Sequence, residues 1–176
     1  MKLLIASDIH GSAVYCRQLM DAVEREKPDK ILLLGDLLYH GPRNALPEGY
    51  DPKAVAEALN GVSEKLLCVR GNCDAEVDQM LLTVPILSES ALVFWEGQTL
   101  YATHGHKEFS ALQKGEILLC GHTHIPAWEE AEGVWHLNPG SVSIPKENSW
   151  HGYLLLEGRT FFWKNLAGEI QKELTI

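Results

Sequence analysis

The first half of the chain alternates short apolar runs with helical patterns. Buried strands are predicted at residues 3–5, 31–34 and 66–69, where apolar side chains are continuous and turn-forming residues bound each run. Apolar residues recur at helical spacing between them, from an N-cap at Ser12 to Glu26, and again over residues 52–59. This strand–helix–strand order is typical of βαβ units, so the first half predicts parallel strands.

The second half changes to short strands and tight turns. Strands are predicted at residues 86–87, 91–95, 99–103, 116–120, 134–137, 152–156 and 160–163. The segments 96–98, 129–133 and 157–158 are predicted as hairpin turns. Residues 40–52 are rich in Gly and Pro and predict a long loop, which in a compact domain is often functional. We expect two sheets packed face to face, with helices outside.

Composition limits the class of protein. The 176 residues, 45% hydrophobic and 22% charged, suit one soluble globular domain over residues 1–176. A net charge of −9 disfavours strong nucleic-acid binding and anionic membranes. We see neither an apolar run long enough for a membrane nor a signal-peptide pattern. The cysteines lack Cys-x-x-Cys spacing, which favours a reducing cytoplasm.

Side chains that can bind metals follow the predicted strands. They are Asp8, His10, Asp36, Asn72, His104, His122 and His124. Period-2 alternation would point Asp8 and His10 the same way, and the carboxyl ends of parallel strands share one sheet edge. Oxygen and imidazole ligands without a cysteine pair favour Mn, Fe, Zn or Ni. Seven such groups suit two ions with one bridging ligand, and the carboxylate of Asp36 is the natural bridge.

The order of these motifs resembles the calcineurin-like metallophosphoesterases. The motifs are Asp8-x-His10, Gly35-Asp36, Gly71-Asn72-x-Asp74, His104-Gly105 and Gly121-His122-x-His124, followed by the fitting segment Asn138-Pro139-Gly140-Ser141. The short length and the segment 41–44 are similar to the small YfcE-type phosphodiesterases of that family. The resemblance implies an α/β fold in which two mixed sheets lie between helices, a four-layer α/β-β/α sandwich.

The resemblance also implies a two-metal phosphodiesterase. One ion would be held by Asp8, His10, Asp36 and His124, and the other by Asp36, Asn72, His104 and His122. Manganese is the expected metal, with Zn, Fe or Ni as alternatives. A water or hydroxide between the ions would attack phosphorus in line, with Asp36, Asn72 and His104 as the catalytic side chains.

One position departs from the family pattern. Many members carry a histidine after the Asn, whereas this chain has Cys73. A thiol is a poor proton donor and a weak phosphate ligand, which favours phosphodiester substrates over monoesters. We expect Arg43, Asn72 and Cys73 to contact a small phosphodiester substrate. The alternative for Arg43 is an ordinary solvated side chain, and that reading is preferred for His40.

Two classes of function stay open. One is the metal-dependent phosphodiesterase, with a phosphomonoesterase as its alternative. The other is a non-catalytic scaffold of the same fold, like the related retromer subunit, which predicts gaps among the metal ligands. All seven ligands are present, which favours the enzyme. We further expect Asp74 to support Asn72 or His104, His106 to lie near the site, and Glu129-Glu130 to form a solvated turn. The oligomeric state stays open.

Overall fold

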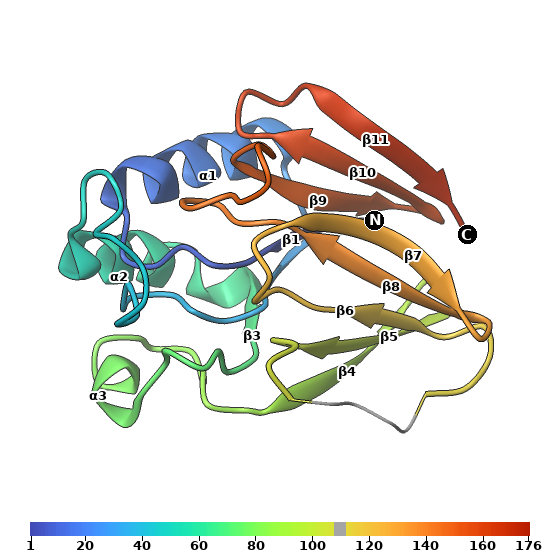
Figure 1. Cartoon of the computed structure of the whole chain (residues 1–176), viewed down its shortest axis with the longest axis horizontal. Coiled ribbons are helices and arrows are strands. Elements are labelled where there is room, and N and C mark those ends of the chain that lie inside the picture. The colour runs from blue at the N-terminus through green and yellow to red at the C-terminus, as the bar shows by residue number, and fades with distance from the viewer. Residues whose placement is uncertain (108–111) are drawn as a thin grey trace.

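Two mixed β-sheets pack face to face in this computed structural model, which describes residues 1–107 and 112–176 (Figure 1). The six-stranded sheet has the order β11-β10-β9-β1-β2-β3 and the five-stranded sheet the order β4-β5-β6-β8-β7. The first contains β1 (Lys2–Ala6), β2 (Lys30–Leu33), β3 (Leu66–Cys68), β9 (Gly152–Glu157), β10 (Thr160–Asn165) and β11 (Ile170–Thr175). The second contains β4 (Ser90–Trp95), β5 (Gln98–Thr103), β6 (Ile117–Leu119), β7 (Pro126–Ala131) and β8 (Val134–Pro139).

The helices follow the predicted crossovers. They are α1 (Ala13–Glu26), α2 (Pro52–Asn60), the 3₁₀ turn Ser63–Lys65 and the short α3 (Glu76–Gln79). The Ser12 hydroxyl accepts from the Tyr15 backbone N–H and caps α1, and Asp51 caps α2 in the same way. β1, β2 and β3 are parallel, as the strand–helix–strand order predicts.

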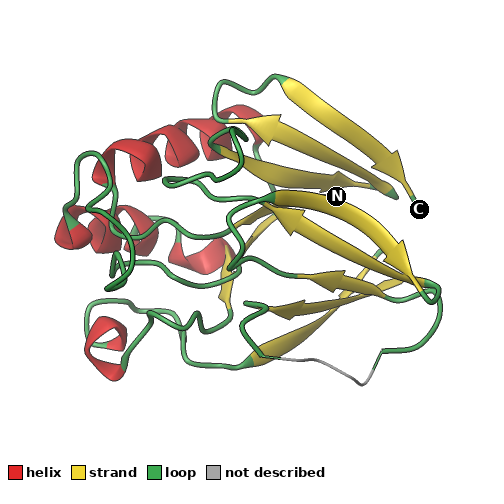
Figure 2. Ribbon diagram, in the orientation of Figure 1, coloured by secondary structure: helices red, strands yellow, loops and turns green. Residues whose placement is uncertain are grey.

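The apolar strands β1 and β2 are continuous because both of their faces are buried. Leu4 and Leu33 pack against α1 and α2, whereas Leu3, Ile5 and Leu32 pack against the five-stranded sheet. One core therefore lies under the helices and a second lies between the sheets. Within the described residues, helices cover the outer face of the six-stranded sheet only (Figure 2).

Several sequence predictions need correction. Residues 86–87 form no strand; Ile86 is buried, and its backbone N–H donates to Gln79 Oε1 at 2.8 Å. Glu129 and Glu130 are exposed but lie in β7, and the hairpin turns later, at Glu132-Gly133. Strands β7 and β11 and helix α3 were not predicted, because exposed edge strands and one-turn helices carry little apolar periodicity. No helix of the described chain is long and apolar enough to span a membrane.

Candidate metal centre

The predicted ligand residues gather beyond the carboxyl ends of β1, β2, β3, β5 and β6. Asp8 and His10 follow β1, and Asp36 follows β2. Their turns are joined, because the Asp8 N–H donates to the Gly35 carbonyl at 3.1 Å and the His10 N–H to the Asp36 carbonyl at 2.9 Å. The parallel strands thus place residues from distant parts of the chain at one sheet edge.

These ligands converge through left-handed turns rather than through strand alternation. Asp8, His10, Asp36, His122 and His124 all have positive φ values, between 49° and 66°. β1 has already ended at Ala6, so the period-2 argument for Asp8 and His10 does not apply, although both side chains reach the site. Non-glycine residues rarely adopt this conformation, and such strain concentrates at functional sites.

Two glycines allow the turns to approach one another closely. A Cβ atom on Gly71 would lie 2.0 Å from Asp36 Oδ1, and one on Gly121 would lie 2.0 Å from Ser7 Oγ. Both contacts are far below van der Waals distance. Any larger side chain would therefore push the turns that carry Asn72 and His122 away from the site.

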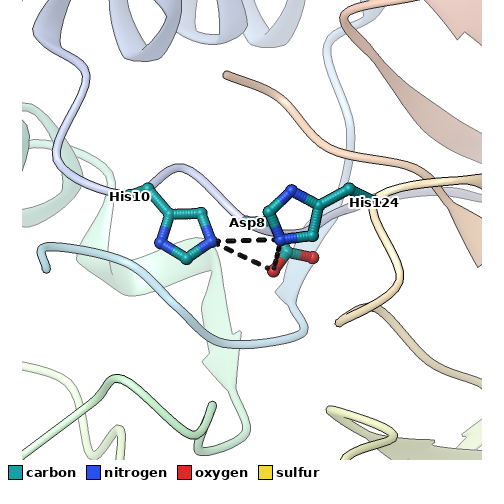
Figure 3. A group of neighbouring side chains, drawn as sticks. All are labelled: Asp8, His10 and His124. Carbon is teal, nitrogen blue, oxygen red and sulfur yellow. Dashed lines mark hydrogen bonds and ion pairs between the residues drawn. The ribbon is translucent and has the colours of Figure 1, made fainter. Parts of the chain in front are cut away.

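The first cluster consists of Asp8, His10 and His124 (Figure 3). Asp8 Oδ1 lies 3.4 Å from His10 Nε2 and 3.3 Å from His124 Nε2, and the two Nε2 atoms are 3.3 Å apart. All three side chains are buried. Three potential ligand atoms thus point at one small volume.

The second cluster shares this neighbourhood and is centred on Asp36. Asp36 Oδ2 lies 3.3 Å from His104 Nε2 and 3.6 Å from His10 Nε2. His104 Nε2 also lies 3.2 Å from Asn72 Oδ1. The Asp36 carboxylate therefore stands between a histidine of the first cluster and one of the second, where a bridging ligand would have to stand.

Backbone carbonyls fix the orientation of three imidazole rings. The Nδ1 atoms of His10, His104 and His124 lie 2.8, 2.6 and 2.8 Å from the carbonyls of Tyr39, Leu34 and Ile144, respectively. A carbonyl only accepts, so each Nδ1 carries the proton, and in the neutral ring Nε2 presents its lone pair to the cluster. Metal-binding histidines are oriented in this way.

The resulting cluster brings acceptors together without donors. Asp8 Oδ1 is buried and makes no hydrogen bond within the described chain, although its neighbours are imidazole nitrogens. Lone pairs facing one another at 3.3 Å repel unless a cation or a proton lies between them. The residues present therefore fit divalent cations, with oxygen and imidazole donors that suit Mn, Fe, Zn or Ni.

The pKa shifts have the direction expected for such a cluster when it holds protons. Burial would lower the pKa of His104, but Asp36 and Asp8 raise it to about 9. The pKa of His10 is raised in the same sense against its burial, chiefly by Asp8. Burial would raise the pKa of Asp8, but His10 and His124 hold it far below its usual value. Metal binding at neutral pH must therefore displace protons from the imidazoles.

His122 stands slightly apart from the other ligands. Its ring centroid is 5.2 Å from that of His104, and its backbone N–H donates to Asp8 Oδ2 at 3.0 Å. His106, predicted to lie near the site, has its ring centroid 5.5 Å from that of His104. Burial and the nearby imidazole of His104 lower the pKa of His122, which favours the neutral form that binds metals.

A pocket of about 450 Å³ opens onto the clusters. Its lining residues are His10, Asp36, Gly41, Pro42, Arg43, Asn44, Asn72, Cys73, His122, Thr123, His124 and Lys146. Residues 41–44 of the loop after Asp36, which lacks periodicity in the sequence and was expected to be functional, thus form part of the wall. Cys73 lies in that pocket, and its backbone N–H donates to Asp36 Oδ1 at 2.8 Å. Lys146 was missed, because no motif surrounds it in the sequence.

Asp74 is a supporting residue, as predicted, and it acts through backbone groups. Its carboxylate accepts from the backbone N–H groups of Asp36, Leu37 and Gly71 at 2.8, 2.9 and 2.7 Å, respectively. It therefore ties the Asp36 turn to the Gly71-Asn72 turn, and it contacts neither the Asn72 nor the His104 side chain. The Gly-Asn-x-Asp motif was the signal for this role.

The end of β8 and the segment that follows it hold the other turns in place. Asn138 Nδ2 donates to the Gly121 carbonyl at 2.8 Å, and the hydroxyls of Ser141 and Ser143 donate to the Asp8 carbonyl at 2.8 and 3.1 Å. The Asn-Pro-Gly-Ser motif was recognised in the sequence, but its role requires contacts across more than a hundred residues.

The chain belongs to the calcineurin-like phosphoesterase superfamily, whose domain model matches residues 1–160. It is 48% identical over 161 residues to phosphodiesterase YfcE of Escherichia coli K12, covering 89% of this chain and 88% of that protein. The solved structure of E. coli YfcE, described as a phosphoesterase, superposes with a TM-score of 0.96 at 44% identity over all of both chains. Zinc-bound Vps29 of Entamoeba histolytica shares the fold alone, with a TM-score of 0.66 at 19% identity over 99% of each chain. The predicted fold of two mixed, face-to-face sheets is confirmed.

Proposed function

We propose that this protein is a phosphodiesterase that uses two divalent cations to cleave a small phosphodiester, with residues 1–176 as one catalytic domain. The observation that carries the proposal is the convergence of buried carboxylate and imidazole acceptors, with no donor between them, at the floor of an open pocket. The relationship to E. coli YfcE, named a phosphodiesterase, supports the same reaction.

The proposed ligand sets follow the two clusters. Asp8, His10, Asp36 and His124 would hold one ion, and Asp36, Asn72, His104 and His122 the other. The position of Asp36 Oδ2, 3.6 Å from His10 Nε2 and 3.3 Å from His104 Nε2, supports a bridge. We favour manganese because it suits the carboxylate and amide oxygens, and the imidazoles keep Zn, Fe and Ni as alternatives.

When bound, the ions supply an activated water for in-line attack and neutralise the charge of the phosphoryl oxygens. The chain's own part is to fix the ligands before substrate arrives. Carbonyls hold the imidazole rings, Asp74 holds the Asp36 turn, and left-handed backbone aims Asp8 and His10. Arg43, Asn72 and Cys73 would contact the substrate, since all three line the pocket. Such preorganisation lowers the reorganisation needed in the transition state.

A diester fits the site better than a monoester. The position beside Asn72 carries the thiol of Cys73, which cannot supply an imidazolium to balance a dianion or to protonate a poor leaving group. A scaffold without activity needs no such acceptor cluster, and the likeness to Vps29 concerns the fold alone. The four cysteines are unpaired, which is consistent with our proposal of a cytoplasmic protein.

The test begins with protein stripped by a strong chelator and dialysed. We expect no release of p-nitrophenol from bis(p-nitrophenyl) phosphate, and recovery when Mn²⁺ is added, with Zn²⁺, Fe²⁺ and Ni²⁺ compared at equal occupancy. Metal content is measured on the same samples. Full hydrolysis by metal-free protein would overturn the mechanism, and absence of both metal uptake and hydrolysis would favour a scaffold.

A further inference from the structure

Two cationic side chains line the pocket beside the metal clusters. Arg43 belongs to the loop after Asp36, and Lys146 belongs to the segment between β8 and β9. Neither side chain makes a hydrogen bond or ion pair with any residue that the structure describes. Apart from the ligand imidazoles, the only other ionisable groups of the lining are Asp36 and the Cys73 thiol, so the pocket is locally cationic in a chain with a net charge of −9.

Both cations project from turns that are fixed in place. The Lys146 backbone N–H donates to the His124 carbonyl at 3.1 Å, and its own carbonyl accepts from the Ser149 hydroxyl at 2.6 Å. In the loop after Asp36, Asn44 Nδ2 donates to the His40 carbonyl at 2.8 Å and closes the turn that carries Arg43. The Lys146 backbone is therefore bonded to that of His124, and the turn that carries Arg43 is closed by its own hydrogen bond, even though both side chains are exposed.

A simple phosphodiester does not use these charges. It carries one negative charge, and two divalent ions already match or exceed the combined charge of Asp8, Asp36, that monoanion and a bound hydroxide. Arg43 and Lys146 then have no counter-charge in the pocket. Cations left unpaired on a pocket wall favour ligands with additional negative charge, by attraction and by charge-assisted hydrogen bonds.

We propose that the substrate is a phosphodiester carrying a second anionic group, a carboxylate or a phosphoryl group, which Arg43 and Lys146 bind while the metal centre holds the scissile phosphate. This inference rests on the proposed function and names its substrate class. Lys146 then acts as a specificity-determining residue, and Arg43 provides a planar fork for the same anion.

The test uses p-nitrophenyl phosphodiesters that share one leaving group and differ in the second ester group. That group is methyl, 2-carboxyethyl, 2-phosphonoethyl or 2-aminoethyl. For metal-loaded native protein at low salt, we expect kcat/KM for the two anionic esters to exceed that for the methyl ester by about 3- to 10-fold, with the aminoethyl ester lowest. The preference should shrink as salt rises, because the charges are exposed. Comparing carboxylate with phosphonate identifies the preferred anion.

Lys146→Gln should bring the anionic-to-methyl ratio of kcat/KM close to one. The matched control is Lys114→Gln, an equal loss of charge just before β6, at the strand end away from His122; it should keep the native ratio. A second readout is calorimetric binding, in which native protein should bind 3-phosphonopropanoate more tightly than propylphosphonate. Lys146→Gln should lose that difference.

The outcomes separate the two proposals. Hydrolysis of all four esters with a ratio near one in native protein, or an unchanged ratio in Lys146→Gln, would overturn the substrate class and leave the phosphodiesterase intact. No hydrolysis of any ester by metal-loaded protein would overturn the proposed function and this inference with it.

Discussion

Glu26 and Asp8 are both buried carboxylates, one at the end of α1 and the other after β1. Glu26 Oε1 accepts from the Tyr153 hydroxyl and from Lys164 Nζ, each at 2.7 Å. Asp8 Oδ1 has no hydrogen bond within the described chain and faces imidazole nitrogens instead. Both regions bury a carboxylate, but the Glu26 oxygen accepts hydrogen bonds from donor side chains, whereas Asp8 Oδ1 accepts none within the described residues.

The difference separates a structural ion pair from a ligand site. The hydrogen-bond partners of the Glu26 carboxylate, Lys164 and Tyr153, are donors; although burial would raise the pKa of Glu26, they hold it below its usual value. Around Asp8 and Asp36 the Nδ1 protons of the imidazoles are directed at backbone carbonyls, so each ring in its neutral form presents an acceptor to the carboxylates. A buried charge is therefore no guide to function by itself, whereas acceptors that face acceptors indicate a site that binds cations or protons.

The largest effect is expected at the shared carboxylate of the acceptor cluster. Asp36→Asn removes charge next to both proposed ions and should lower kcat by roughly 10³-fold or more, with loss of bound metal. Asn72→Ala should cost less, because it removes one neutral ligand of one ion. Rates and metal content of both variants are compared with those of Asp21→Asn, the same change at an exposed position of α1. Equal losses in the Asp36 and Asn72 variants would count against the bridge.

The donor-rich region should respond in stability rather than activity. Glu26→Ala leaves Lys164 without its partner and should lower the free energy of unfolding by about 2–4 kcal/mol, while the folded variant keeps its kcat. Glu24→Ala, an exposed change on the same helix, should stay within about 0.5 kcal/mol of native protein. Denaturant unfolding measures both. A near-neutral Glu26→Ala would break the contrast between the two regions.

The ion pair of Glu26 and Lys164 makes the free energy of unfolding depend on pH, in a direction that follows from the pKa of Glu26. The folded-state pKa of Glu26 lies below its ordinary value of 4.5, so the folded protein binds fewer protons at this site than the unfolded chain. The stabilisation is therefore fully present above about pH 4.5 and is lost as pH falls through the lowered pKa. The difference in stability between native protein and Glu26→Gln should be constant at neutral pH and shrink in acid.

Cys73→His adds an imidazole to the acceptor cluster and should shift substrate preference. The native protein should prefer diesters, and the variant should raise the monoester-to-diester ratio of kcat/KM by about tenfold, below the 10²–10⁴ that general acid catalysis can contribute. The surrounding residues were not arranged to aim that ring, which limits the gain. Cys73→Ala, which adds no imidazole, is the control. A native preference for the monoester would contradict the expected diester preference. An unchanged monoester-to-diester ratio in Cys73→His would contradict the expected shift.

The smallest effect is expected on the pocket wall. Arg43→Ala should reduce kcat/KM by about 3- to 10-fold for a diester that carries a second anionic group, while both proposed ions stay bound, because the guanidinium is exposed and makes no hydrogen bond or ion pair within the described residues. Arg17→Ala, on the exposed face of α1, is the matched control. If the kinetics of Arg43→Ala equal those of the control, Arg43 is an ordinary solvated side chain that does not contact the substrate.

The sequence by itself predicted the residue types of the proposed metal ligands and the strand ends that they follow. Continuous apolar runs predicted β1 and β2, and the glycine-flanked Asp, Asn and His residues followed them in an order typical of one family. These predictions were possible because the periodicity of apolar residues reflects their burial. In addition, a site that needs acceptor side chains requires particular residue types, which the sequence shows directly. The edge strands β7 and β11 escaped, since exposed strands show little apolar pattern.

Only the tertiary structure decided how those residues meet. Which carbonyl orients His124, which backbone groups Asp74 holds and where Lys146 lies all depend on contacts between segments far apart in sequence. Even the convergence of Asp8 and His10 comes from left-handed turns that local alternation did not predict. The physical reason is that a residue's conformation and protonation at a site are imposed by its packed neighbours, and a linear pattern carries no record of them.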